Sequence, residues 1–91
     1  MNYVVVFNIT HSEEHQHQKV YDILNREYNL KHFEMQNDRK VLAPATTVMG
    51  KNSDFKTARE MAESIIDRLL QDEITLDRIV VSRGNDYSLI G

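Results

Sequence analysis

The chain of 91 residues contains no cysteine and no tryptophan, one proline and three glycines. Without cysteine it has no disulfide framework, no thiolate metal site and no cysteine nucleophile. Its 41% of hydrophobic and 27% of charged residues, with so little glycine and proline, are typical of a globular domain and not of a disordered or collagen-like chain. A second core would leave each half too small, so we expect one domain over residues 1–91.

Long hydrophobic runs and an excess of positive charge are also absent. The apolar stretch at residues 3–7 is too short for a signal peptide or a membrane span, and no basic segment precedes it, so we expect a cytoplasmic protein that does not associate with membranes. The net charge is −3, whereas binding to a nucleic-acid backbone requires clustered positive charge. Nucleic acid is therefore the less expected partner of this small acidic protein.

The first third of the chain predicts a strand followed by a helix. Residues 1–9 contain a β-branched and aromatic run of strand length, apolar enough for the centre of a sheet. Thr10 and Glu13 have the spacing of a capping box at the start of a helix. Apolar residues recur at helical spacing over about residues 12–28, and Asn29 is expected to end this helix.

The middle of the chain predicts a β-hairpin. Apolar and polar residues alternate over residues 32–36, as in a strand with one covered face, and residues 37–40 supply turn chemistry. The return strand is expected over residues 41–49, with an edge position or a bulge at Pro44, which has no N–H to donate to a ladder.

A second helix is predicted over residues 55–69, where apolar residues recur at steps of three and four after an N-cap at Ser53 or Asp54. Further apolar residues widen its stripe, so we expect one face to lie on a sheet, with a coiled coil as the alternative. These widening residues are Met61, Ile66 and Leu70.

The C-terminal part predicts a buried strand over residues 76–82, a turn over residues 84–86 and a short final strand over residues 87–90. In a free tail, the apolar side chains of the final strand would remain exposed to solvent. Adding this strand to a second subunit would bury them and cover a sheet edge. We therefore expect a dimer interface formed by Tyr87, Leu89 and Ile90.

The order strand, helix, strand, strand, helix, strand predicts an α+β domain of the ferredoxin-like βαββαβ plan. Such a domain has an antiparallel sheet with both helices on one face, here with a further C-terminal strand. Two helices cover only one face of the sheet, and the other face carries apolar as well as polar residues. We therefore expect a homodimer in which a second subunit covers it.

Histidines near the first helix are candidate metal ligands. His11 and His15 are four residues apart, a spacing at which two imidazoles on a helix can share a divalent transition metal. The alternative is a polar first turn in which the neighbouring Glu13 and Glu14 complement the helix dipole. Apart from this divalent metal, no cofactor is expected.

Asn8 and Thr10 form a candidate ligand-binding site, because they follow the first strand and face a helix start, where anions and other ligands often bind. Structural capping is the alternative role. Asn8 is a neutral and weak ligand for a hard cation, which argues against a catalytic magnesium site at this position.

The sequence YVVVFNI at residues 3–9, followed by KVYDIL at residues 19–24 in a helix, resembles the small CRISPR-associated dimeric nuclease of spacer acquisition and its VapD-type ribonuclease relatives. The resemblance implies a ferredoxin-like dimer in which a short strand after the last core strand pairs across the subunits, as residues 87–90 are placed to do. It also implies a metal held at the dimer interface by an acidic residue at the end of the first strand. The chain departs from that pattern at Asn8.

These observations favour a noncatalytic homodimeric module that binds another protein or regulates it, in microbial or viral defence or counter-defence. No catalytic residue is assigned. One alternative is a metal-dependent endoribonuclease like the CRISPR-associated nuclease, which the resemblance supports. The other is a small-ligand sensor, since ferredoxin-like dimers can enclose a ligand between their sheets.

Overall fold

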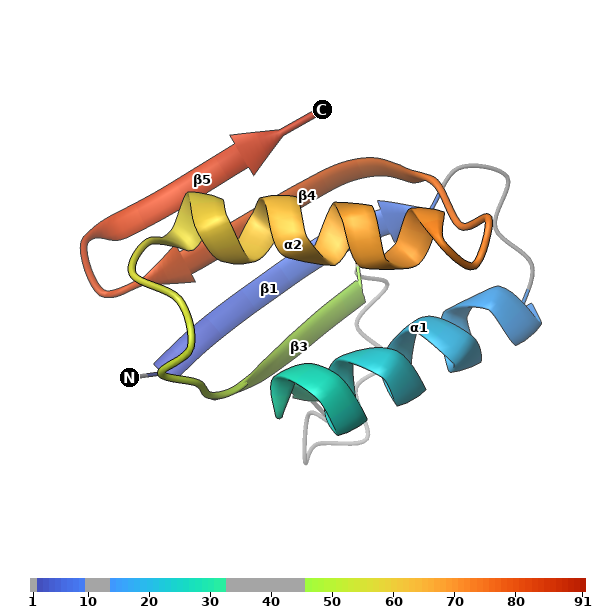
Figure 1. The fold of residues 1–91 in the computed structure, drawn as a ribbon, viewed down its shortest axis with the longest axis horizontal. Helices are drawn as coiled ribbons and strands as arrows, with labels where there is room; N and C mark the ends of the chain where they lie inside the picture. Colours follow the sequence, from blue (N-terminus) through green and yellow to red (C-terminus); the bar gives the residue numbers. More distant parts are fainter. Residues whose placement is uncertain (1, 10–13, 33–45) are drawn as a thin grey trace, which may run out of the picture.

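The structure is a computed structural model that describes residues 2–9, 14–32 and 46–91 (Figure 1). Its sheet has the strand order β2-β3-β1-β4-β5, and each strand is antiparallel to its neighbours. This confirms the ferredoxin-like α+β fold with an added C-terminal strand. The elements are β1 (Asn2–Ile9), α1 (Glu14–Tyr28), β2 (Lys31–His32), β3 (Thr46–Lys51), α2 (Ala58–Leu70), β4 (Leu76–Arg83) and β5 (Asp86–Ile90).

Both helices lie on one face of the sheet (Figure 1), as the apolar stripes predict. Alternate residues of the central strand β1 are buried on that face, from Tyr3 to Ile9, while the residues between them are only half-buried. Because side chains alternate along a strand, one face of β1 lies in the core and the other does not. The helices complete this core with buried apolar residues that include Val20, Leu24, Met61, Ile65 and Leu69.

The first helix ends where the sequence indicates. Tyr28 is the last residue of α1, and Asn29 has φ 58°, a left-handed conformation that asparagine tolerates better than most residues. The chain then turns so that the Leu30 N–H donates to the Leu24 carbonyl at 2.9 Å. The predicted helix start at residues 10–13 lies outside the described residues.

The prediction of an N-cap at Ser53 or Asp54 is wrong, because α2 begins later. Thr57 caps the helix with its side-chain oxygen, which accepts a hydrogen bond from the Glu60 N–H at 3.1 Å. The Glu60 carboxylate accepts in turn from the Lys56 N–H at 3.0 Å, so the Thr57–Glu60 pair forms a capping arrangement. The first residue of α2 is therefore Ala58.

Phe55, predicted within the second helix, precedes it. Its ring is partly buried and stacks on Tyr28 at a centroid separation of 6.0 Å. Leu70 does not join the buried stripe of α2 either, since half of it is exposed at the end of the helix. The helix therefore buries a narrower face than the apolar residues alone suggest.

The described residues include two paired positions of β2 and β3. Lys31 pairs with Met49 and His32 with Val48, whereas the predicted turn and most of both predicted strands fall in residues 33–45, outside the described residues. β3 extends to Lys51, two residues beyond the prediction. Gly50 is required in this strand, because a Cβ there would lie 1.9 Å from the Asn29 carbonyl oxygen.

Candidate binding surface on the sheet

One face of the sheet carries neither helix. The β1 residues between the buried positions point to this face, and the register places paired residues of the other strands beside them. Two rows cross it, Met49–Val4–Ser82–Tyr87 and Thr47–Val6–Val80–Leu89. We call this surface the open face. It consists of the two rows and of the residues paired next to them, which are Asn2, Asn8, Lys31, Lys51 and Arg78.

The centre of the open face is apolar and partly exposed to solvent. Its three valines are half-buried between the strands. Three larger side chains stand out from them, with exposed fractions of 38% for Met49, 58% for Leu89 and 74% for Tyr87. Contiguous apolar side chains at a surface are a common feature of interaction sites, so this face is the candidate functional surface of the domain.

The charged side chains of the open face are all basic. Lys31 and Lys51 lie near one corner, on β2 and at the end of β3, and Arg78 lies on β4 toward the other end of the strands. No acidic residue occupies a paired position of this face in the described part of the chain. Asp77, the extra residue of a bulge beyond the last row, is exposed next to Arg78 between the core-facing Leu76 and Ile79, so it offsets part of the positive charge at that end. The face is therefore locally positive on a chain of net charge −3.

The basic side chains of the open face differ from two arginines of the helix layer in their salt bridges. Within the described residues, the side chains of Lys31, Lys51 and Arg78 form no salt bridge. On the helix layer, by contrast, Arg59 pairs with Glu63 at 2.8 Å and Arg68 with Glu27 at 2.9 Å. No carboxylate of the described residues therefore neutralises these three side chains by a salt bridge.

β5 ends the sheet with an exposed edge. The β4–β5 turn has two central residues, Gly84 at φ +58° and Asn85 outside the positive-φ region, which is the geometry of a type II′ hairpin. In such a hairpin the closing pair Arg83–Asp86 is hydrogen-bonded, and bonded pairs alternate with unbonded ones along the ladder. The backbone N–H and C=O groups of Tyr87 and Leu89 therefore point outward.

Little protects this edge against another strand. Proteins usually guard edge strands with lysine, proline or a bulge, and β5 contains none of these. Its one charged side chain, Asp86, is engaged elsewhere, because its Oδ2 accepts a hydrogen bond from the Ala58 N–H at the start of α2 at 2.8 Å. The edge thus offers outward backbone groups without a repelling charge.

The structure separates the predicted interface residues. Tyr87 and Leu89 lie on the open face, whereas Ile90 points to the helix side and packs against the core of its own chain. A dimer interface formed by these three residues stays a prediction. The alternation of a strand places neighbouring residues on opposite faces, so Leu89 and Ile90 do not share a surface.

The other predicted site residues are described only in part. Asn8 lies on the open face opposite Arg78, while Thr10 and His11 fall outside the described residues. His15 belongs to α1, but its side chain is not described. Among the described residues, no three histidine or carboxylate side chains are grouped as a metal site would require. The metal and ligand sites remain predictions.

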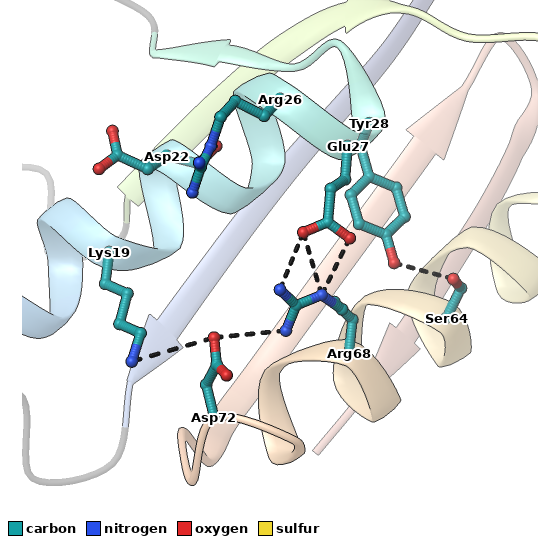
Figure 2. Close-up of polar contacts among 8 residues, drawn as sticks. All are labelled: Lys19, Asp22, Arg26, Glu27, Tyr28, Ser64, Arg68 and Asp72. Atoms are coloured by element: carbon teal, nitrogen blue, oxygen red, sulfur yellow. Dashed lines mark hydrogen bonds and ion pairs between the residues drawn. The ribbon is translucent and has the colours of Figure 1, made fainter.

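A polar cluster joins the two helices on the opposite side of the molecule (Figure 2). Arg68 of α2 donates from Nε to both carboxylate oxygens of Glu27 of α1 at 2.9 and 3.0 Å, and its Nη1 lies 3.3 Å from an Asp72 oxygen. These hydrogen bonds, to Glu27 above all, raise the pKa of Arg68. Beside them, the hydroxyls of Tyr28 and Ser64 lie 2.9 Å apart.

This cluster fits a structural role. Its donors and acceptors satisfy one another between α1 and α2, and burial raises the pKa of Tyr28, against the effect of its Ser64 hydrogen bond. Only the Arg68–Asp72 spacing of four residues is readable from the sequence, because Glu27 and Arg68 are 41 residues apart. The cluster as a whole was therefore not predictable from the sequence.

Arg83 forms a second polar anchor on the helix side of the sheet. Its Nη1 donates to the Tyr3 hydroxyl at 3.0 Å and to the Phe55 carbonyl at 3.2 Å, and its Nη2 donates to the Lys56 carbonyl at 2.6 Å. The guanidinium carbon lies 5.5 Å from the centre of the Tyr3 ring. Arg83 thus holds the connection before α2 against the sheet, close to the β4–β5 turn.

Comparisons of the chain with protein-family models, curated proteins and solved structures find no match. No described helix has the length and apolar character needed to cross a membrane. The candidate function therefore depends on the chemistry of the open face and the β5 edge.

Proposed function

We propose that the protein is a noncatalytic homodimeric module that binds another protein, and that two copies join by antiparallel pairing of their β5 strands. The observation that carries this proposal is the unguarded outer edge of β5, flanked by the exposed side chains of Tyr87 and Leu89. Pairing would join the two sheets into one and leave both open faces on the same side. Placement in microbial or viral defence is supported by the resemblance to the CRISPR-associated nuclease.

The outward backbone groups determine the register of such a dimer. A two-fold axis at Ser88 places Tyr87 of one copy opposite Leu89 of the other, and both of these residues have outward N–H and C=O groups. Two bonded pairs then give four hydrogen bonds, each contributing about 0.5 to 1.5 kcal/mol net. Two tyrosine–leucine pairs on the open side add about 0.2 to 1 kcal/mol each.

Paired charge variants test this dimer. The double variant Tyr87→Lys/Leu89→Lys places like charges opposite each other across the axis, as does Tyr87→Glu/Leu89→Glu, so each is expected to be monomeric. A mixture of the two is expected to form a heterodimer, because every cross-strand pair then becomes a lysine–glutamate pair. Sedimentation equilibrium measures the association of all three samples.

The control is Leu70→Lys, which removes a leucine of similar exposure, 50% against 58% for Leu89, from the end of α2 and should leave dimerisation unchanged. A wild-type chain that remains monomeric at tens of micromolar, or two variants that fail to associate on mixing, would contradict the proposal. Truncation after Arg83 is a poorer test, because it also removes Asp86 from the start of α2.

The noncatalytic part of the proposal has its own test. Asn8 stands where the resembled nuclease family has an acidic metal ligand, so no turnover of single-stranded RNA or duplex DNA is expected with magnesium or manganese. Activity that appears only in Asn8→Asp would indicate a lapsed nuclease site. Wild-type activity that Asn8→Ala abolishes would favour the endoribonuclease alternative.

A further inference from the structure

A partner of the open face must match both its apolar centre and its basic ends. The centre presents Val6, Val80 and Leu89 with the exposed Met49 and Tyr87 around them. Along β1, the rows at its two ends are six residues apart, or about 20 Å at the rise of an extended strand. The matching ligand is therefore elongated and apolar along its middle, with negative charge at both ends.

Two other occupants match this face less well. A second copy laid face to face would set basic side chains against basic side chains, since the open face carries no paired acid among the described residues. Single-stranded nucleic acid is usually held by several stacked aromatic residues, and Tyr87 is the one aromatic residue that the described part of the chain places on the open face. Its aliphatic centre instead suits aliphatic side chains.

We infer that the open face binds an amphipathic helix from an acidic protein. Sheet faces are commonly covered by helices, and a helix of about 13 residues spans 20 Å. Its apolar stripe would lie on the valines of β1 and β4, with carboxylates at one end near Lys31 and Lys51 and at the other near Arg78. This inference rests on the proposed function only in taking the ligand to be a protein.

The test uses two synthetic peptides of about 14 residues, a length that spans this face as a helix. Both carry the same leucine stripe, and the charged residues at both ends are glutamate in one and lysine in the other. Titration into the isotope-labelled full chain, followed by backbone amide shifts, is expected to show at least about tenfold tighter binding of the glutamate peptide. A tenfold ratio of this kind is within the range of charge matching. The shifted amides should include Val6 and Val80.

Charge-reversal variants test whether the preference for the glutamate peptide comes from the open face or from another part of the surface. The triple variant Lys31→Glu/Lys51→Glu/Arg78→Glu is expected to reverse the preference in favour of the lysine peptide. The matched control, Arg26→Glu/Lys56→Glu/Arg59→Glu, makes the same change in net charge at exposed positions of the helix layer. It should keep the preference for the glutamate peptide.

Several results would overturn the inference. These are equal binding of both peptides, no binding of either at millimolar concentration, and a preference that survives the open-face triple variant. Tighter binding of a 12-nucleotide oligouridine, lost in Tyr87→Ala, would assign the face to nucleic acid instead. Sedimentation of the free chain keeps the two proposals apart: a monomer that still selects the glutamate peptide contradicts only the dimer, and a dimer without selection contradicts only this inference.

Discussion

Removing the carboxylate of Asp86 should destabilise α2, although the two are distant in sequence. Asp86 Oδ2 accepts from the N–H of Ala58, the first residue of α2, across 28 positions of the chain. Ala58 is fully buried, so Asp86→Ala leaves a donor without its acceptor, at a cost of about 1 to 3 kcal/mol. Asp86→Asn keeps an acceptor oxygen and loses only the charge beside the positive end of the helix dipole, which is worth about 0.3 to 1 kcal/mol.

Urea denaturation followed by circular dichroism measures both losses. All variants are compared at one protein concentration, because the proposed dimerisation would make the midpoint depend on concentration. The expected order of the free energy of unfolding is wild type, then Asp86→Asn, then Asp86→Ala. Equal losses in the two variants, or a loss below about 0.5 kcal/mol in Asp86→Ala, would refute the role of this hydrogen bond as a long-range helix cap.

Three further predictions concern the core and the contacts between elements. Ile65→Ala should cost about 2 to 5 kcal/mol in urea unfolding, since Ile65 is 1% exposed, and a loss below about 1 kcal/mol would contradict its place in the core. Gly50→Ala should cost about 2 kcal/mol or more, because the new methyl group would meet the Asn29 carbonyl, and a neutral result would exclude this close approach. Burial raises the pKa of Tyr28 in the folded state. The contribution of this shift to the free energy of unfolding is complete below the unfolded pKa of about 10, and it is lost as the pH rises through the pKa of the folded state. Tyr28→Phe should therefore weaken the fall in stability above about pH 10, and an unchanged alkaline slope would contradict the assignment.

The sequence by itself determined the elements and their order. The β-branched run in β1 and the steps of three and four in α2 reflect backbone periods of two and 3.6, which depend on local dihedral angles alone. Local chemistry also located the turn at Gly84 and the helix end at Asn29, where φ is positive. Ser53, Asp54 and Thr57 all have side chains suited to cap α2. Only the hydrogen bonds of the structure distinguish them, because Thr57 accepts from the Glu60 N–H.

Only the tertiary structure decided which residues meet. Asp86 with Ala58 and Arg68 with Glu27 are pairs that sheet register and helix packing bring together from distant parts of the chain. The same register gathers Lys31, the end of β3 and Arg78 on one face, where no acid occupies a paired position among the described residues, so a chain of net charge −3 presents a locally positive surface there. Composition averages over every side chain, whereas a ligand meets only those that one face presents, and strand pairing determines that selection.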